Sequence, residues 1–188
     1  MNKTKRKIFE ISMKLFAEKG YDATSIEEIT SRVGVAKGTL YYHFSSKEEI
    51  FSFLVEEGVK LLKNSIEIKT QKLDNVMDKL RAIILIEIKI MAKYEDFMTL
   101  LLSQIWGNEP RNNMCKKYVF EYIKIIEKIV KEGIEKGELI DLDPEMIATG
   151  IFGITCSSLV YKLKTEKPID AKQICYEYEK TVLKGLKK

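Results

Sequence analysis

A short segment at residues 36–43 carries side chains that hydrogen-bond well to phosphate oxygens and to the edges of bases. Its sequence is AKGTLYYH, so two turns of helix would hold an ammonium, a hydroxyl, two phenols and the only histidine of the chain. The polar candidates are Lys37, Thr39, Tyr41, Tyr42 and His43. Side chains of these types suit the backbone and groove walls of a nucleic acid, and the segment therefore predicts an element that contacts DNA.

The preceding residues predict how that element is positioned. Residues 24–33 predict a short helix that opens with a capping box, in which Ser25 and Glu28 satisfy free backbone amides. Gly34 then supplies the backbone freedom that a tight turn needs. Two short helices joined by a glycine turn are typical of a helix-turn-helix, whose second helix lies in the major groove.

Residues 8–50 resemble the DNA-binding domain of the TetR family of one-component regulators. The resemblance is carried by Phe16 and Gly20, by Thr24 to Ile29, and by the string VGVAKGTLYYHFSSKEEIF. It implies that four side chains bind phosphates as clamps, namely Thr39, Tyr42, His43 and Lys47. It also implies that the protein represses transcription.

Two adjacent residues at the start of the second helix are expected to face the bases. Lys37 can reach the O6 and N7 acceptors of guanine, and Gly38 allows close approach of groove and backbone at a helix cost of about 1 kcal/mol. Tyr41 is expected to contact the DNA backbone and a thymine methyl group. Thr24 or Ser25 would add a hydroxyl, beside free helix amides, to a neighbouring phosphate.

Glu27 departs from the family pattern, which often places a basic residue in this region. A carboxylate near a phosphate would repel it, so two alternatives are open. Glu27 either points away from the DNA or accepts a hydrogen bond from N4 of a cytosine. The transfer of a detailed base preference from the family is therefore not justified.

Composition and motifs exclude several classes of protein. The hydrophobic share of 45% argues against disorder, and the odd number of cysteines without a CxxC pair argues against a secreted disulfide framework. The most apolar run, AIILIEIKIMA, is interrupted by Glu87 and Lys89. No GxSxG motif, phosphate-binding glycine loop or paired metal ligands occur. We therefore expect a soluble cytoplasmic protein that is not an enzyme and has no cofactor, metal or membrane partner.

The periodicity of apolar residues predicts an all-α fold in two domains. Residues 1–47 form an N-terminal three-helix helix-turn-helix DNA-binding domain, and residues 48–188 form a C-terminal helical ligand-binding and dimerisation domain. Outside the helix-turn-helix, the pattern predicts helices over 3–19, 46–70, 73–93, 95–106, 111–136, 144–164 and 170–186.

The helix at 144–164 is the candidate dimer interface, because helix-turn-helix proteins usually bind DNA as pairs. It is apolar around most of its circumference, and small residues on one side allow another helix to come close. With the helix at 170–186 it would form half of a four-helix interface, as the family resemblance implies. The interface candidates are Thr149, Gly150, Gly153, Ser157, Val160, Ile174 and Tyr178. The alternative is a helix buried within one chain.

Glu87 is the strongest indication of a ligand-binding core, because a carboxylate on an apolar helix face is costly unless it is paired. It either orients a cationic or hydroxylated ligand, or pairs with a tyrosine hydroxyl or Arg81 within the core. Aromatic and sulfur-containing residues would complete an apolar wall with polar tips. The wall candidates are Met91, Tyr94, Phe97, Met98, Trp106, Met114, Tyr118 and Tyr122.

These features predict a homodimeric repressor of a palindromic double-stranded DNA operator, which a small apolar effector releases. The effector would enter between helices 80–94 and 111–136 and displace helix 46–70, changing the spacing of the two DNA-reading helices. The alternative is a DNA-binding protein of the same fold whose C-terminal half is a protein-interaction surface without a small-molecule inducer.

Overall fold

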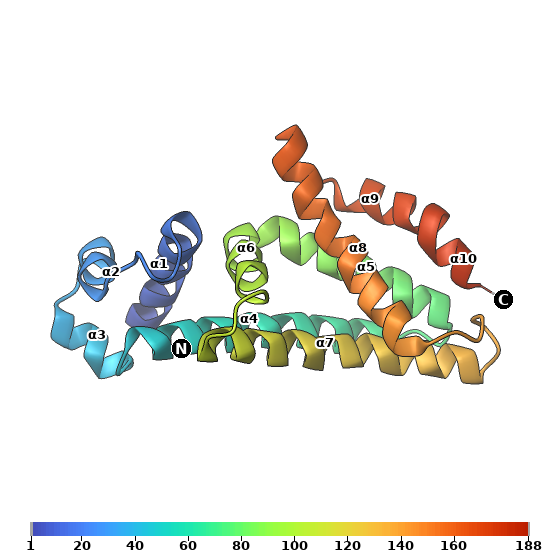
Figure 1. The fold of residues 1–188 in the computed structure, drawn as a ribbon, viewed down its shortest axis with the longest axis horizontal. Helices are drawn as coiled ribbons and strands as arrows, with labels where there is room; N and C mark the ends of the chain where they lie inside the picture. The colour runs from blue at the N-terminus through green and yellow to red at the C-terminus, as the bar shows by residue number, and fades with distance from the viewer. Residues whose placement is uncertain (1, 188) are drawn as a thin grey trace. The chain divides into compact units, whose positions relative to one another are not determined.

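The computed structural model describes residues 2–187 as an all-α fold (Figure 1). An isolated bridge between Leu139 and Lys187 is the one extended pairing recorded for this part of the chain. The elements are α1 (Lys3–Lys19), α2 (Ile26–Val33), α3 (Lys37–His43), α4 (Lys47–Thr70), α5 (Val76–Lys93), α6 (Glu95–Gln104), α7 (Pro110–Glu135), α8 (Pro144–Thr165), α9 (Ala171–Tyr178), the π-helical segment η1 (Glu179–Leu183) and α10 (Lys184–Leu186).

The helices confirm the predicted all-α class, and among the boundaries that differ from the prediction, two have identifiable reasons. α5 begins at Val76 rather than residue 73, because the Asn75 side chain accepts a hydrogen bond from the backbone N–H of Asp78 at 3.1 Å and caps the helix. The single helix expected over 170–186 is divided by η1 into α9 and α10, since wider π-helical hydrogen bonding interrupts the α-helical register.

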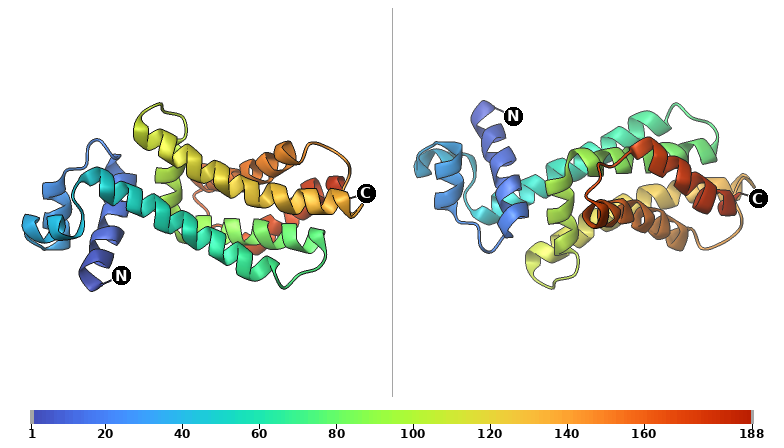
Figure 2. Two further views of the ribbon diagram at one scale, coloured as in Figure 1. Left: turned by 90° about the horizontal axis from the view of Figure 1, so that it is seen from below. Right: turned by 90° about the horizontal axis from the view of Figure 1, so that it is seen from above.

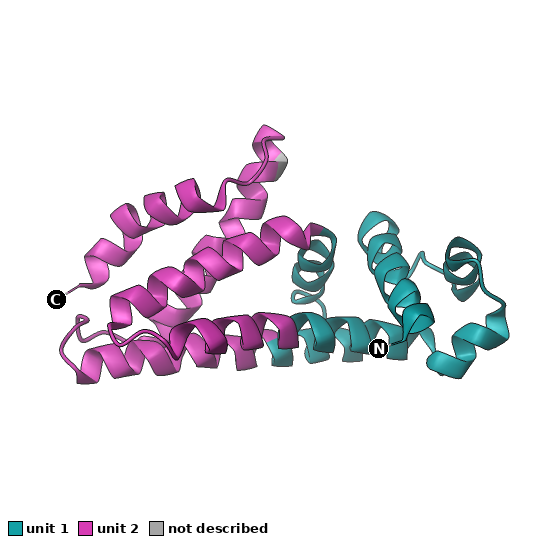
Figure 3. Cartoon of the chain, turned by 180° about the vertical axis from the view of Figure 1, so that it is seen from behind, with its two compact units in different colours: residues 1–59, 96–118 teal, residues 60–95, 119–188 magenta. Residues whose placement is uncertain are grey.

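The chain divides into two compact units, coloured separately in Figure 3. Unit 1 consists of residues 1–59 and 96–118, and unit 2 consists of residues 60–95 and 119–188. The boundary therefore falls within α4, after Val59, and not at residue 47. The functional division into residues 1–47 and 48–188 stays a prediction, because compactness does not test which residues bind DNA or ligand.

Unit 1 is built around an aromatic cluster from three elements. Phe16 of α1, Tyr21 of the following turn and Phe51 of α4 lie with ring centroids 5.1–6.0 Å apart, and all three are buried. α6 approaches α4 so closely that a Cβ atom on Gly58 would lie 2.2 to 2.6 Å from three ring carbons of Phe97. The first part of α4 thus packs against both the helix-turn-helix and α6.

Unit 2 is a helical core in which α5 lies against α8 and α9, as the two views of Figure 2 show. The turn after α7 is held to α5 by Glu138, whose carboxylate accepts a hydrogen bond from the backbone N–H of Val76 at 2.9 Å. Leu139 is buried beside Gly133, where a side chain would have no room. Within residues 2–187, no helix combines the length and the apolarity that crossing a lipid bilayer requires.

Candidate DNA-binding surface and ligand-sensing core

The helix-turn-helix has the local geometry that the sequence predicts. Ser25 caps α2, since its Oγ accepts a hydrogen bond from the backbone N–H of Glu28 at 3.1 Å. Gly34 ends α2 in the left-handed conformation, with φ of 76°, and its N–H donates to the carbonyls of Thr30 and Ser31. α3 follows three residues later. A side chain with a Cβ would be strained at Gly34, and glycine therefore fixes the turn between the two helices.

α3 separates a buried face from an exposed polar face. Leu40 is fully buried and the adjoining Phe44 is 1% exposed, so both belong to the core of unit 1. Tyr42, by contrast, is 85% exposed and Tyr41 is 45% exposed. The predicted contact residues at 37–39 are also exposed, and His43 is half-buried with its ring against that of Tyr42. α3 therefore presents its predicted DNA-contacting residues to solvent.

Lys37 and Glu27 form an ion pair between α3 and α2, with Nζ and Oε1 2.6 Å apart. The hydrogen bond from Lys37 lowers the pKa of Glu27, and the same bond raises the pKa of Lys37. Both side chains are more than half exposed, so the pair is open to competition from solvent and salt. The pairing supplies a role for Glu27 that neither sequence-based alternative considered: it holds the ammonium of the predicted base-contacting lysine.

Thr24 and Lys47 are engaged inside unit 1. Thr24 is 1% exposed, and its hydroxyl donates to the carbonyl of Gly20 at 2.9 Å. The Lys47 ammonium donates to the carbonyls of Tyr21 at 3.0 Å and Thr24 at 2.9 Å. Both residues organise the turn before α2, and their predicted contacts with phosphate stay predictions.

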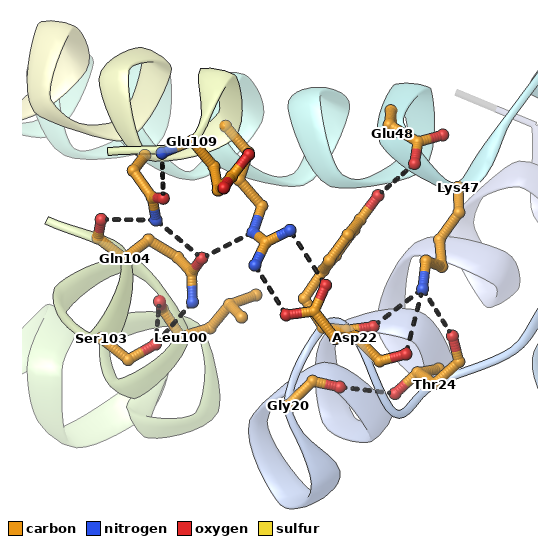
Figure 4. Close-up of polar contacts among 12 residues, drawn as sticks. Gly20, Asp22, Thr24, Lys47, Glu48, Leu100, Ser103, Gln104 and Glu109 are labelled. Carbon is orange, nitrogen blue, oxygen red and sulfur yellow. Dashed lines mark hydrogen bonds and ion pairs between the residues drawn. The ribbon is translucent and has the colours of Figure 1, made fainter. Parts of the chain in front are cut away.

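The surroundings of Tyr21 form a polar network that the sequence did not predict (Figure 4). The Tyr21 hydroxyl donates to Glu48 at 2.8 Å, and the cationic groups of Lys47 and Arg111 lie over the Tyr21 ring, 4.3 and 4.6 Å from its centroid. Arg111 also binds Asp22 with both terminal nitrogens, at 3.0 and 2.7 Å. Burial, followed by the contact with Glu48, raises the pKa of Tyr21.

No sequence signal could have revealed this network. Asp22 and Arg111 are 89 positions apart, and each is an ordinary charged residue in its local sequence. Arg111 stands in the first turn of α7, and its Nε donates to Gln104 at 3.0 Å. The tertiary fold of unit 1 alone brings the start of α7 to the turn between α1 and α2.

In unit 2, the structure brings Glu87 and Tyr122 together in a buried pair. Glu87 is 1% exposed and Tyr122 is 2% exposed, and the tyrosine hydroxyl donates to Oε1 of Glu87. The other carboxyl oxygen, Oε2, is buried without a hydrogen-bond partner. Burial raises the pKa of Glu87 to about 8, opposed first by the hydrogen bond from Tyr122, while the nearby Thr155 hydroxyl donates to the carbonyl of Phe152 at 2.8 Å. Burial likewise raises the pKa of Tyr122.

The pairing corresponds to one of the two alternatives for Glu87, the tyrosine hydroxyl, whereas Arg81 binds Asp78 and Glu179 instead. It leaves the ligand-contact alternative open, because half of the carboxyl group is unsatisfied. The neighbouring face of α8 adds Thr155 and Ser158, both buried polar residues. The core around Glu87 is therefore apolar with a small polar centre.

The remaining wall candidates are distributed over both units. Met91 is buried in unit 2, where it accepts a weak hydrogen bond from Ser158 at 3.8 Å, and Tyr94 is half-buried there. Phe97 and Met98 are buried in unit 1, and Met114 and Tyr118 are half-buried there. Trp106 is 85% exposed, because it lies in the connection between α6 and α7, and it adds no buried wall in this structure.

The candidate dimer interface is an exposed face of α8. Thr149, Gly150, Gly153 and Ser157 are exposed, and Val160 is 65% exposed. The opposite face of α8 buries Ala148, Ile151, Thr155 and Leu159. The expected burial around most of the circumference thus holds for one face only, and the face with the small residues is uncovered in the single chain.

Ile174 and Tyr178 of α9 are half-buried next to this face. The Tyr178 hydroxyl lies 2.8 Å from Ser157 Oγ, so the structure brings these two interface candidates together. Between α8 and α9 runs a groove of about 470 Å³, and its lining includes Ser157, Ile174 and Tyr178. The predicted interface residues are therefore contiguous on unit 2.

An all-α chain with a capped helix-turn-helix and an exposed polar α3 defines a helix-turn-helix transcriptional regulator. Comparison with protein-family models finds "Bacterial regulatory proteins, tetR family" over residues 8–53 and "Tetracyclin repressor-like, C-terminal domain" over residues 73–186. The chain belongs to the TetR family of DNA-binding transcriptional regulators, which are not enzymes. The resemblance carried by the motif at residues 24–47 is confirmed.

Known relatives support this assignment. The uncharacterized HTH-type transcriptional regulator YerO of Bacillus subtilis (strain 168) is 30% identical over 93% of this chain, which spans 61% of the length of YerO. A solved Clostridium perfringens putative fatty acid metabolism regulator is 32% identical, with a TM-score of 0.90 over 96% of this chain and 98% of that chain.

A third solved structure is FadR from Bacillus subtilis in complex with stearoyl-CoA. It has a TM-score of 0.85 over 96% of this chain and 98% of that chain. At 22% identity, this similarity concerns the fold alone.

Proposed function

We propose that the chain is a dimeric repressor that a small, mainly hydrophobic ligand releases from its operator. The observation that carries the ligand response is the buried acid of the α5 helix, Glu87, whose Oε2 is unsatisfied at the centre of an apolar core. A core evolved for stability alone has little reason to retain such a group, since burying an unsatisfied polar atom costs about 1 to 3 kcal/mol. The DNA-binding part rests on the exposed face of α3.

The protonation of Glu87 narrows the chemistry of the ligand. With a pKa of about 8, the carboxyl group is mainly neutral at pH 7. Tyr122 already donates to Oε1, so the acidic proton resides on Oε2, where it needs an acceptor. A carbonyl oxygen on an apolar molecule meets this requirement, whereas a carboxylate or a phosphate next to Glu87 would place a charge in the apolar core at high cost.

Fatty acyl thioesters combine an apolar chain with a carbonyl oxygen, and they are the first class to test. Two relatives agree with this choice in their descriptions: the Clostridium perfringens putative fatty acid metabolism regulator, and FadR, which was solved with stearoyl-CoA. The predicted operator is palindromic double-stranded DNA bound by a homodimer. The protein would act in the cytoplasm, where its three cysteines stay reduced.

The test begins with a DNA duplex selected from random sequences by the wild-type protein. Its affinity is then measured by fluorescence anisotropy at fixed salt, with and without stearoyl-CoA, and with coenzyme A alone as the control. We expect stearoyl-CoA to lower operator affinity by about 5- to 150-fold, the range of typical allosteric coupling. Unchanged affinity with stearoyl-CoA and with a series of shorter acyl thioesters would contradict the proposed ligand class.

The alternative is a DNA-binding protein of the same fold whose C-terminal half binds a protein. Glu87→Leu separates the two proposals. In a ligand sensor, this variant keeps operator affinity but loses the response to the acyl thioester, because the polar centre is gone. A matched control is Glu10→Leu, which replaces an exposed acid on α1 that pairs with Arg6.

A further inference from the structure

The network around Tyr21 assigns a role in DNA binding to a residue outside the helix-turn-helix. We propose that Arg111 is a positioning residue for operator binding, which acts by holding residues 20–25, the turn before α2, in the conformation that offers the start of α2 to a phosphate. This proposal goes beyond the ligand response, and it concerns unit 1 alone.

The first argument is that Arg111 holds the Asp22 side chain. The backbone of the turn has anchors of its own: the N–H of Thr24 donates to the carbonyl of Tyr21 at 3.3 Å, the Thr24 hydroxyl donates to the carbonyl of Gly20, and the Lys47 ammonium donates to the carbonyls of Tyr21 and Thr24. These contacts hold the backbone, whereas the Asp22 carboxylate is bound by Arg111 (Figure 4).

The second argument is geometric. Arg111 binds the carboxylate of Asp22 through two nitrogens, and its guanidinium also lies over the Tyr21 ring. Such bidentate contacts fix orientation as well as distance, which a single ammonium does not do. Arg111 is itself held, because its Nε donates to Gln104, whose Oε1 also accepts from Asn112 at 3.1 Å. The contact with Gln104 therefore fixes the orientation of the Arg111 guanidinium independently of the turn.

The third argument is electrostatic. Asp22 is 77% exposed and stands three residues before Ser25, the cap of α2. The N-terminus of a helix favours an anion, and a free carboxylate beside it would repel the DNA phosphate. Arg111, which lies at the start of α7 and outside the helix-turn-helix, neutralises that carboxylate. Its loss would both loosen the turn and uncover a negative charge near the DNA.

The test measures operator affinity for wild type, Arg111→Ala, Asp22→Ala and the double variant, using a duplex selected by the wild-type chain. We expect Arg111→Ala to lower affinity about fivefold, consistent with a partly exposed but bidentate pair. In the Asp22→Ala background, the same change should cost less than about twofold, because the interaction is already absent. Equal costs in both backgrounds would overturn the proposal.

Salt dependence distinguishes positioning from direct contact. An arginine that binds a phosphate contributes about 0.9 to the slope of log affinity against log salt concentration. Because Arg111 acts through the turn and through the charge of Asp22, the slope of Arg111→Ala should differ from that of wild type by much less than the roughly 0.9 of a lost phosphate contact. A slope smaller by about one in magnitude would identify Arg111 as a DNA-contacting residue and overturn the proposal.

Hydrogen exchange supplies a readout that needs no DNA. Arg111→Ala should accelerate exchange of the backbone amides at residues 22–25, while exchange in α5 stays as in wild type. The matched control is Arg81→Ala in unit 2, an arginine with two carboxylate partners, which should alter neither the turn nor operator affinity. Unchanged exchange at residues 22–25 would overturn the proposal even if no operator were found. Absence of any selected duplex would instead count against the proposed function.

Discussion

Gly38 is the residue of α3 at which stability and DNA binding favour different side chains. A Cβ atom there would meet no other atom of the chain within 4 Å, so packing does not require glycine. Glycine in a helix costs about 1 kcal/mol against alanine. The helix retains it nonetheless, which agrees with the expectation that DNA comes close at this position.

We predict effects of opposite sign for Gly38→Ala. The free energy of unfolding should rise by about 0.5 to 1 kcal/mol, while operator affinity should fall by roughly tenfold, since a methyl group would separate α3 from the groove. Thermal or urea denaturation and anisotropy titration measure the two effects. Gly185→Ala in α10 is the control, because it also meets no neighbour but lies outside the DNA-binding surface. Retained affinity in Gly38→Ala would contradict the proposed role.

Glu87 is predicted to make the stability of the protein depend on pH. Its folded pKa is raised to about 8 from the ordinary value of 4.5, so its favourable neutral form is fully present below pH 4.5. Stability is then lost as the pH rises from 4.5 through 8. Glu87→Gln removes this titration. The free energy of unfolding of the variant, relative to that of wild type, should therefore rise by roughly 2 to 4 kcal/mol between pH 4 and pH 9.

Urea denaturation at a series of pH values measures this difference, and Glu10→Gln on the exposed face of α1 serves as the control. The informative quantity is how the difference in free energy of unfolding between variant and wild type changes with pH, because other groups titrate equally in both proteins. Parallel curves for Glu87→Gln and wild type would show that Glu87 is ionised at ordinary cost in the folded state.

At the scale of elements, the contact between α4 and α6 depends on the absence of a side chain at Gly58. The ring of Phe97 packs against Gly58, where a Cβ atom would come within 2.2 Å of it, so the two helices approach closely inside unit 1. The sequence shows Gly58 only as an unfavourable residue in the middle of a long helix. The reason for a glycine at this position becomes clear only when the packing of α6 against α4 is known.

We predict that Gly58→Ala lowers the free energy of unfolding by about 1 to 3 kcal/mol, because the cost of overpacking exceeds the gain in helix propensity. Replacing the ring with a smaller side chain, in the double variant Gly58→Ala/Phe97→Leu, should restore part of the lost free energy of unfolding. Both are measured by urea denaturation, with Gly185→Ala again as the control for helix propensity. A variant as stable as wild type would mean that Phe97 moves aside without cost.

At the scale of the whole molecule, the exposed face of α8 is the surface that needs an explanation. Met146 and Val160 are 71% and 65% exposed, and small residues lie between them. We propose that a second copy of the chain covers this face, since a palindromic operator needs two α3 helices one turn of DNA apart. The same arrangement would place the groove between α8 and α9 at the interface.

Val160→Glu is predicted to convert the dimer into monomers, because it puts a charge at the centre of an apolar contact. Operator affinity should fall at least about tenfold, since a single reader binds one half-site only. Sedimentation velocity and anisotropy measure the two effects. Phe120→Glu is the control: Phe120 is 59% exposed on α7, outside the proposed interface. A dimeric Val160→Glu protein with wild-type affinity would require another interface.

Most of the helices and the DNA-reading motif were predictable from local sequence. Ser25 caps α2, Gly34 ends it, and Asp143 caps α8 by accepting hydrogen bonds from backbone N–H groups two and three residues later. Capping and turn geometry therefore depend on neighbours only a few residues away. The alternation of Leu40 and Phe44 with exposed tyrosines likewise follows from helical periodicity. The sequence by itself therefore determined the fold class, the family and the face of α3 that is exposed and predicted to contact DNA.

The tertiary structure decided which distant side chains meet. It paired Glu87 with Tyr122 and left one oxygen unsatisfied, and it joined Asp22 to Arg111. It also engaged Lys47 and Thr24 with backbone carbonyls of the turn before α2. These contacts follow from how helices pack, and a helical pattern specifies which face is apolar without specifying its partner.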